Sequence, residues 1–478
     1  MTDGTDQPPP DEPPRPPAGP PADRAVSPAG RAVSLAVQAD PAVSPASQAD
    51  PGGLPRGRWW RWFGLGLVAV LLLCGAPVAV LAAVGKLPGR SADAAPGPAR
   101  SPRPGDPDEV VGAWLAERIR ERLDRQAEAL LRGDEAGFLA VSDPARPGAA
   151  QLRREFRSLR ALRVVLWRPE LRTGPTRVPD RPGEWRQPVT FQHCYAAPGC
   201  PPGGVTMVTR WAENGAQPRL VGIEPSVSAD EGPRPWEVDD LVVAAGRRVV
   251  VATTADLRGR LSGLLAEADR AAAVADRYAV TGAPPDRYRI FLAGPPQWKR
   301  WYGGDLPEWT AGYAASVGGG GHEVVLNAKG LTDGAADELL RHEMTHAASL
   351  VGRDNVDKAN WWLVEGIAEH AAAAGRPPRR YPGLPDVRRL LGSGWDGRLA
   401  DLEPARDAAG WRVSGSYGIG YLAFRHLVDR YGESTARAFF TAVVRDGRSA
   451  EEAARKVFGE DWSALHDDCV AYLRSVTG

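Results

Sequence analysis

The distribution of hydrophobic and polar positions divides the chain into segments of different character. Residues 1–55 are rich in Pro and almost without large apolar side chains. This segment buries too little apolar surface to offset its ordering entropy, so we predict that it is disordered. Residues 62–85 carry no charge, and residues 86–107 are again rich in Pro. From residue 108 onward, helical periodicity and short β-like runs alternate, which predicts folded structure.

The uncharged run over residues 62–85 is long enough to cross a membrane. Its 24 residues would form a helix of about 36 Å, and the hydrocarbon core of a bilayer is about 30 Å thick. Trp59, Trp60 and Arg61 precede it, and amphipathic rings and cations suit the headgroup layer. A cleaved signal peptide would have a shorter apolar region and no leader of about 60 residues. The pattern predicts one transmembrane helix, followed by a linker over residues 86–107.

The cysteines indicate the side of the membrane. Cys194 and Cys200 flank a short turn-forming segment, a spacing that suits a small disulfide loop. Disulfides persist outside the cytosol, whereas a zinc site here would need a second pair of ligands nearby. Cys74 and Cys469 are expected to be ordinary buried thiols. We therefore predict a protein of the cell membrane, with residues 1–55 as a cytoplasmic tail and the larger part of the chain extracellular.

Residues 108–228 are predicted to form an α+β accessory domain. Apolar side chains recur at helical spacing from Val110 to Leu131, and four strand-like runs follow, over residues 162–167, 189–195, 204–211 and 219–223. Helices followed by a curled antiparallel sheet resemble the nuclear-transport-factor-two-like fold, a cone with a pocket. This resemblance implies a domain that binds a ligand or acts as a spacer next to the membrane.

Residues 236–478 are predicted to form a mainly helical domain with a small sheet, so the fold class is α+β. Its β-like runs lie at residues 248–252, 288–293 and 322–327. We expect the last of these to be an edge strand that could bind an extended peptide by strand addition. The chain has 59 basic and 59 acidic residues. This balance argues against a nucleic-acid partner, because such binding requires excess positive charge.

The sharpest chemical signal is the motif His342-Glu343-Met344-Thr345-His346. It lies in a predicted helix, where residues four apart share a face, so His342 and His346 can direct both imidazoles at one metal ion. Glu343 follows His342 directly and can reach a water molecule bound to that ion. Two His on an Ala-rich helix could also be ordinary surface or core residues, so the motif alone leaves both interpretations open.

A third ligand candidate completes the set. Glu365 follows His346 after 18 intervening residues and lies near the start of another predicted helix. Two His and one Glu form the protein part of a catalytic zinc site, whose fourth position is left to water. Zinc lowers the pKa of that water toward about 7, so a hydroxide-like nucleophile exists at neutral pH. We therefore predict that His342, His346 and Glu365 bind Zn²⁺.

The two motifs together resemble those of the gluzincin metallopeptidases, in particular the peptidase MA-like branch to which aminopeptidase N belongs. The second motif reads Trp362-Leu363-Val364-Glu365-Gly366-Ile367-Ala368-Glu369. The resemblance covers residues 238–476 and implies zinc ligation by His342, His346 and Glu365, with Glu343 as the general base. It also implies a Tyr that donates to the oxyanion. Tyr417 fits the Tyr-x-x-Gly pattern of the family, and Tyr421 is the alternative.

The chain also departs from this family. Aminopeptidases carry a Gly-x-Met-Glu-Asn strand before the first zinc helix, and the corresponding residues 312–327 lack that motif. Aminopeptidase specificity therefore does not follow from the resemblance. Glu369 lies one helical turn after Glu365 and could orient a ligand His or be a solvated side chain. His426 is a second candidate donor to the oxyanion.

These observations predict a membrane-anchored extracellular zinc metallopeptidase. This hydrolase would cut peptide bonds of a peptide or protein substrate with a metal-activated water. The alternative is a non-catalytic, zinc-holding ectodomain that acts in binding or as a scaffold. Endopeptidase and exopeptidase activity, and any oligomeric state, are all compatible with the sequence.

Overall fold

The computed structural model describes residues 100–478, except residues 216, 227–231, 281–282, 305, 320, 333–334 and 353–355. The predicted tail, the predicted transmembrane helix and most of the predicted linker lie outside the described residues. Within the described part of the chain, no helix combines the length and the apolar character needed to cross a membrane.

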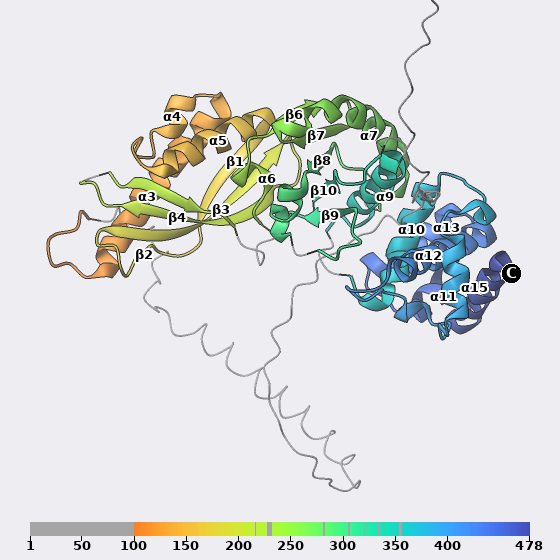
Figure 1. The fold of residues 1–478 in the computed structure, drawn as a ribbon. Helices are drawn as coiled ribbons and strands as arrows, with labels where there is room; N and C mark the ends of the chain where they lie inside the picture. The colour runs from red at the N-terminus through yellow and green to blue at the C-terminus, as the bar shows by residue number, and fades with distance from the viewer. Residues whose placement is uncertain are drawn as a thin grey trace, which may run out of the picture.

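The N-terminal third of the described chain is an antiparallel sheet preceded by helices (Figure 1). The helices are α3 (Asp108–Arg132), α4 (Glu135–Leu139) and α5 (Pro147–Ala161). The strands are β1 (Val164–Leu171), β2 (Thr176–Arg177), β3 (Glu184–Tyr195), β4 (Gly203–Ala212) and β5 (Arg219–Glu224). They pair in the order β1-β3-β4-β5, with β2 on β3. Burial alternates along β4, as expected when one face of a sheet covers a core.

The predicted disulfide is present in this sheet region. Cys194, in β3, is bonded to Cys200, and both residues are buried. Cys469 is a buried free thiol, as predicted, and burial raises the pKa of that thiol to about 12. Cys74 lies outside the described residues.

A second, mixed sheet follows α6 (Pro235–Val238). Its strands are β6 (Val242–Ala245), β7 (Val249–Thr253), β8 (Tyr288–Ala293), β9 (Gly312–Ser316) and β10 (His322–Asn327). They pair in the order β6-β7-β8-β10-β9, and β7, β8 and β10 are mutually parallel. One face of this sheet packs on α7 (Leu261–Ala275) and α9 (Ala335–Ser349). The short helix α8 (Pro295–Trp298) follows β8.

The position of the edge strand differs from our expectation. Residues His322–Asn327 form β10, as predicted, but β10 lies between β8 and β9 and is not an edge. The edge next to β10 is formed by β9, Gly312–Ser316, which the sequence did not identify, and the opposite edge is β6. Its Gly, Ala and Ser residues have low β propensity, and its strand conformation depends on pairing with β10.

The two sheets share one hydrophobic core. A single cluster contains Trp167 of the first sheet and Val325 of the second. Within it, Glu323 of β10 is buried and accepts hydrogen bonds from the hydroxyls of Tyr195 and Tyr302. In addition, the N–H of Gly204 in β4 donates to the carbonyl of Val317, directly after β9, at 3.0 Å. The antiparallel sheet is thus fixed to the edge-strand side of the mixed sheet.

Burial raises the pKa of Glu323 to about 8, which gives a testable dependence of stability on pH. The folded chain keeps the Glu323 proton up to about pH 8, whereas the unfolded chain loses it near pH 4.5. Between these values the folded state binds more protons. This group therefore lowers the free energy of unfolding by about 1.4 kcal/mol per pH unit as pH rises.

We expect Glu323→Gln to remove this contribution, so the variant gains stability relative to the parent as pH rises from about 5 to 8. The measurement is the unfolding midpoint of both proteins across that range. The matched variant is Glu155→Gln. Glu155 is also buried and its pKa is also raised to about 8, so this variant should show the same gain in stability relative to the parent as pH rises. Parallel pH curves for Glu323→Gln and the parent would contradict the assignment.

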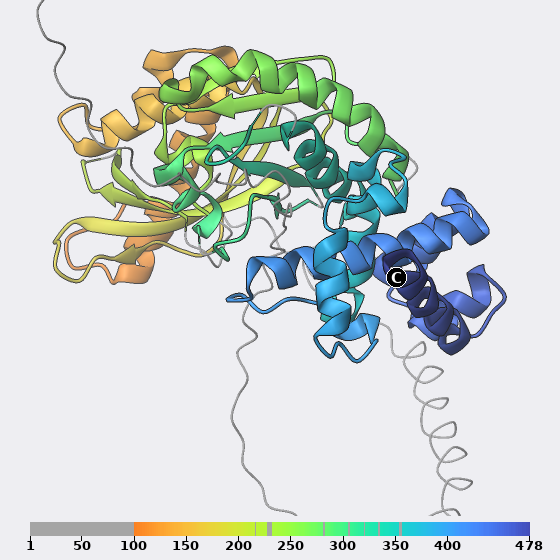
Figure 2. The same cartoon turned by 45° about the vertical axis from the view of Figure 1, so that its right-hand side comes forward.

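The C-terminal part of the chain is helical (Figure 2). It contains α10 (Trp361–Ala373), α11 (Leu384–Gly392), α12 (Gly410–Tyr431), α13 (Glu433–Phe440), α14 (Ala450–Val457) and α15 (Trp462–Thr477). Helix α10 lies between α9 and α12 and packs against both. A Cβ atom on Gly366 of α10 would meet the Gly420 carbonyl oxygen of α12 at 2.5 Å. The crossing of these two helices therefore requires glycine.

We expect Gly366→Ala to destabilise the protein by about 1–3 kcal/mol or more, because backbone atoms cannot yield to the new methyl group without moving a helix. Thermal or denaturant unfolding measures this loss. The control is Gly263→Ala in α7, where nothing lies within 4 Å of the added Cβ. This control is expected to gain up to about 1 kcal/mol from helix propensity. Equal stability of the two variants would refute the close crossing.

Candidate metal centre

The three predicted ligands come from two packed helices. His342 and His346 lie one turn apart on α9, and Glu365 lies on α10. Both helices are at the junction between the mixed sheet and the C-terminal helices (Figure 1). All three side chains are fully buried, so the fold directs them into the interior at one point.

The ligand atoms are close enough to share one ion. The Nε2 atoms of His342 and His346 are 3.0 Å apart. The Oε2 atom of Glu365 is 3.2 Å from the first nitrogen and 3.4 Å from the second. Zinc is bound at roughly 2.0–2.2 Å by such atoms, and a tetrahedral arrangement at that radius separates neighbouring ligands by roughly these distances. Neither carboxylate oxygen of Glu365 has a hydrogen-bond partner among the described residues. The residues fit a divalent ion such as Zn²⁺.

The electrostatics of the metal-free group show the same convergence. Burial lowers the pKa of His342, but contacts with the carboxylates of Glu365 and Glu369 outweigh it and raise the pKa to about 10. Burial dominates at His346 and lowers its pKa. Burial also disfavours the charged form of Glu365, but both imidazoles offset it and the pKa of this carboxyl is lowered. A cation at this point would replace the His342 proton as the partner of these carboxylates.

Glu343 is buried beside the ligands. Neither of its carboxylate oxygens makes a hydrogen bond to a described residue. Burial is the main reason that its pKa lies well above the usual range. A Cβ on Gly312, at the start of β9, would stand 2.9 Å from Glu343 Oε1. The backbone of the edge strand thus lies directly against this carboxyl group.

Glu369 is placed to orient His342. Its Oε1 atom lies 3.1 Å from the Nδ1 atom of His342, and its Oε2 atom accepts a hydrogen bond from the Tyr381 hydroxyl at 2.8 Å. A carboxylate on the second ring nitrogen fixes the orientation of a ligand His and strengthens it as a donor. Of the two interpretations of Glu369, the structure favours the orienting role over a solvated side chain.

The two Tyr candidates lie in different surroundings. The buried ring of Tyr417 is 6.0 Å from the ring of His342 and 5.0 Å from that of Trp361. Tyr421 instead donates to the carbonyl oxygen of Arg376 at 3.2 Å and stacks on Tyr381. Tyr417 is therefore the candidate adjacent to the metal group.

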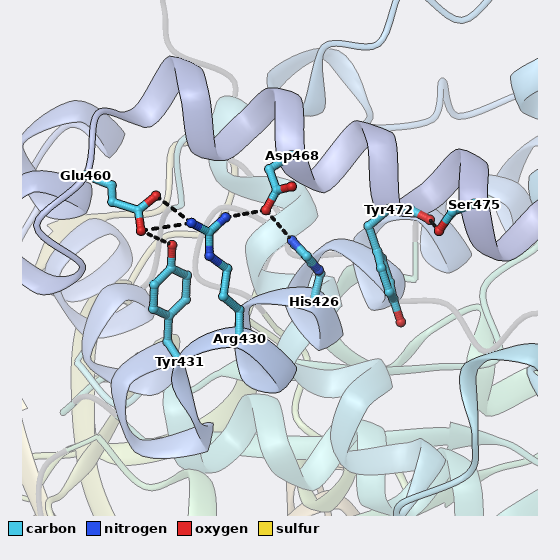
Figure 3. A network of polar contacts seen from close by, with 7 residues as sticks. All are labelled: His426, Arg430, Tyr431, Glu460, Asp468, Tyr472 and Ser475. Atoms are coloured by element: carbon cyan, nitrogen blue, oxygen red, sulfur yellow. Dashed lines mark hydrogen bonds and ion pairs between the residues drawn. The ribbon is translucent and has the colours of Figure 1, made fainter.

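His426 is not part of the centre. Its Nε2 atom lies 2.8 Å from Oδ2 of Asp468 on α15, and Arg430 contacts the same oxygen (Figure 3). Arg430 also reaches Glu460, which accepts from the Tyr431 hydroxyl (Figure 3). This network ties α12 to the C-terminal helix α15. The structure thus gives His426 a partner on α15, and a role as second oxyanion donor stays a prediction.

Two residues of the site carry no signal in the sequence. Tyr381 follows α10 in a segment without a recognisable motif. Only the structure shows that its hydroxyl donates a hydrogen bond to Glu369. Gly312 lies thirty positions before His342, and its importance comes from the close approach of β9 to Glu343.

Comparison with known proteins gives only distant similarity. No family model matches the chain, and no curated protein matches it. Among solved structures, yeast LTA4 hydrolase is similar with 14% identity and a TM-score of 0.32, over 48% of this chain and 38% of that one. The M1 zinc metallopeptidase from Deinococcus radiodurans has 16% identity and a TM-score of 0.29, over 56% and 58%. The chain thus spans less than two thirds of either protein.

Proposed function

We propose that this chain is a membrane-anchored, extracellular, zinc-dependent peptidase. The observation that carries the proposal is the convergence of His342, His346 and Glu365 at one buried point. Glu343 supports catalysis rather than simple metal storage, because its carboxyl group is buried next to the ligands without a hydrogen-bond partner in the part of the chain that the structure describes. A site that only held zinc or formed a scaffold would not need that unpaired acid.

The chemistry of the site assigns a task to each residue. A bound Zn²⁺ would polarise the scissile carbonyl and lower the pKa of a water molecule toward about 7. Glu343 would take the proton that this water loses on attacking the carbonyl carbon, and would then deliver it to the leaving amine. Tyr417 would donate a hydrogen bond to the carbonyl oxygen as that oxygen gains negative charge. Glu369 would hold His342 in its orientation.

The open edge of β9 is the proposed platform for the substrate backbone. It is one of the two outer strands of the mixed sheet, and it lies against Glu343 at Gly312. An extended peptide that pairs with an edge strand is held by main-chain hydrogen bonds. Strand addition would bring a peptide bond of the substrate past the metal group. We place this function on β9 rather than on β10.

The location at the outer face of the cell membrane is part of the proposal. The uncharged residues 62–85 would provide the anchor, and the Cys194–Cys200 disulfide supports an oxidising compartment. Thiol labelling of intact cells tests the orientation. These two cysteines should react only after a reductant is added, and reaction without a reductant would argue against it.

The test of the activity uses the full-length chain purified in detergent and a mixed peptide library read by mass spectrometry. We expect about one zinc per chain and peptide cleavage that stops with a chelator and returns with Zn²⁺. The cleavage positions would also separate endopeptidase from exopeptidase action. Stoichiometric zinc without any cleavage would favour the non-catalytic binding or scaffold role, and absence of zinc would refute both.

A further inference from the structure

Tyr381 contacts both the carboxylate next to a metal ligand and the helix that carries Tyr417. It follows the 3-10 turn η6 (Pro378–Arg380) and precedes α11. Its hydroxyl donates a hydrogen bond to Oε2 of Glu369 at 2.8 Å. The other oxygen of that carboxylate, Oε1, lies 3.1 Å from Nδ1 of His342. One carboxylate thus connects the phenol of Tyr381 to the imidazole of a metal ligand.

The ring of Tyr381 packs on α12 directly after Tyr417. It stacks on the ring of Tyr421, with the two centroids 4.7 Å apart. A Cβ atom on Gly418, the residue next to Tyr417, would stand 3.0 Å from Cε1 of Tyr381. The phenol ring therefore lies against the helix backbone one position after the candidate oxyanion donor, whose own ring is 6.0 Å from that of His342.

The chain around Tyr381 holds its ring in this place. The N–H of Tyr381 donates to the carbonyl of Pro378 at 3.0 Å, and its own carbonyl accepts from the N–H of Leu384 at 3.1 Å. On the side of its own segment, a Cβ on Gly383 would stand only 2.6 Å from Cε1 of Tyr381. The ring is thus enclosed between its own turn and α12, so its hydroxyl meets Glu369 in a fixed geometry.

We propose that Tyr381 is a positioning residue that sets a metal ligand and the oxyanion donor together. Its hydroxyl holds the Glu369 carboxylate against His342, and its ring holds α12 so that Tyr417 stays beside the metal group. Partners behind a metal ligand fix its orientation and strengthen its binding, and a catalytic donor must be held in register with the reacting atoms. This inference rests on the proposed peptidase function and adds to it the residue that aligns its two parts.

The task of the hydroxyl is tested by zinc affinity, measured on the full-length chain in detergent by competition with a chelating dye. Tyr381→Phe keeps the ring and removes the hydroxyl. We expect its Kd for Zn²⁺ to rise about tenfold, while kcat at saturating zinc changes little. The matched control is Tyr288→Phe, because the Tyr288 hydroxyl also donates to a carboxylate, that of Asp276, at 2.9 Å. This control should keep the parent Kd, and a parent-like Kd for Tyr381→Phe would overturn the proposal.

A double-mutant cycle shows whether the hydroxyl acts through Glu369. Glu369→Ala alone should raise the Kd for zinc by about 10–100-fold. Adding Tyr381→Phe to that variant should raise it little further, because the hydroxyl then has no carboxylate to hold. A merely structural effect of Tyr381 would add to that of Glu369→Ala, and additive losses would contradict the proposed role.

The task of the ring is tested by kcat at saturating zinc, on a peptide that the parent cleaves. Tyr381→Leu should lower kcat by about tenfold or more, since a misplacement of about 1 Å can cost about 10²-fold, whereas Tyr381→Phe should keep the parent kcat. Equal kcat values for these two variants would refute the part of the proposal that concerns Tyr417. If the parent binds zinc but cleaves no peptide, the peptidase function and the Tyr417 part fail together. The zinc Kd of Tyr381→Phe then still decides the part that concerns His342.

Discussion

Replacing Glu343 by Gln is expected to leave zinc in place and to reduce kcat by roughly 10²–10⁴-fold, the contribution of a positioned general base. Gln has nearly the same shape as Glu, so it fits the space between α9 and Gly312 of β9. It cannot accept the proton of the attacking water. Because Glu343 is not among the three converging ligands, the metal content should not change.

Two measurements make this result specific. Zinc content per chain is determined for the parent and for Glu343→Gln, and kcat is determined on the same peptide. Glu451→Gln, an exposed glutamate at the start of α14, provides a control that removes the same charge far from the ligands and should retain full kcat. Undiminished turnover by Glu343→Gln would remove the general-base role from this residue.

The metal ligands could be predicted from the sequence because their geometry is mostly local. His342 and His346 share a face of α9 by helix periodicity alone. The third ligand, Glu365, was predicted from the donor set of a zinc site and its place near the start of the next predicted helix, and the structure brings its carboxylate within 3.4 Å of both ring nitrogens. The regular strands β8 and β10 were also predictable, because their apolar, β-branched residues give a clear pattern.

The remainder of the site depends on contacts between distant segments. β9 is a strand because it pairs with β10, and its Gly312 is needed because Glu343 lies behind it. Tyr381 donates a hydrogen bond to Glu369 from another segment, and His426 pairs with Asp468 of α15. No local pattern encodes such long-range contacts, so the ligands and the candidate role of Glu369 could be predicted, but neither the position of β9 nor the contact from Tyr381 could.

The structure also changes the interpretation of the accessory domain. Its sheet shares a core with the mixed sheet and donates a backbone hydrogen bond at the end of β9. We therefore interpret residues 108–228 as a support for the edge strand rather than as an independent ligand-binding module. A support of this kind fixes β9 relative to α9, and such rigidity is what a catalytic base at Glu343 requires.

Replacing Glu365 by Ala is expected to abolish stable zinc binding and, with it, all peptidase activity. The substitution leaves two imidazoles, 3.0 Å apart and buried, without the carboxylate that shares the ion. Loss of an outer-shell partner alone costs roughly 10–100-fold in metal affinity, and loss of a ligand should cost more. Zinc at about 1,000 times its Kd would stabilise the parent by about 4.1 kcal/mol, a gain that the variant forfeits.

Titration with Zn²⁺, followed by metal content and by the unfolding midpoint, measures both effects. The parent midpoint should rise with zinc and fall with a chelator, whereas the midpoint of Glu365→Ala should respond to neither. Glu365→Gln keeps one oxygen ligand without its charge and should fall between the two. Glu451→Ala controls for the loss of a glutamate and should behave as the parent does. A zinc response of Glu365→Ala equal to that of the parent would mean that the ion is held elsewhere, and the convergence of α9 and α10 on a single cation would lose its support.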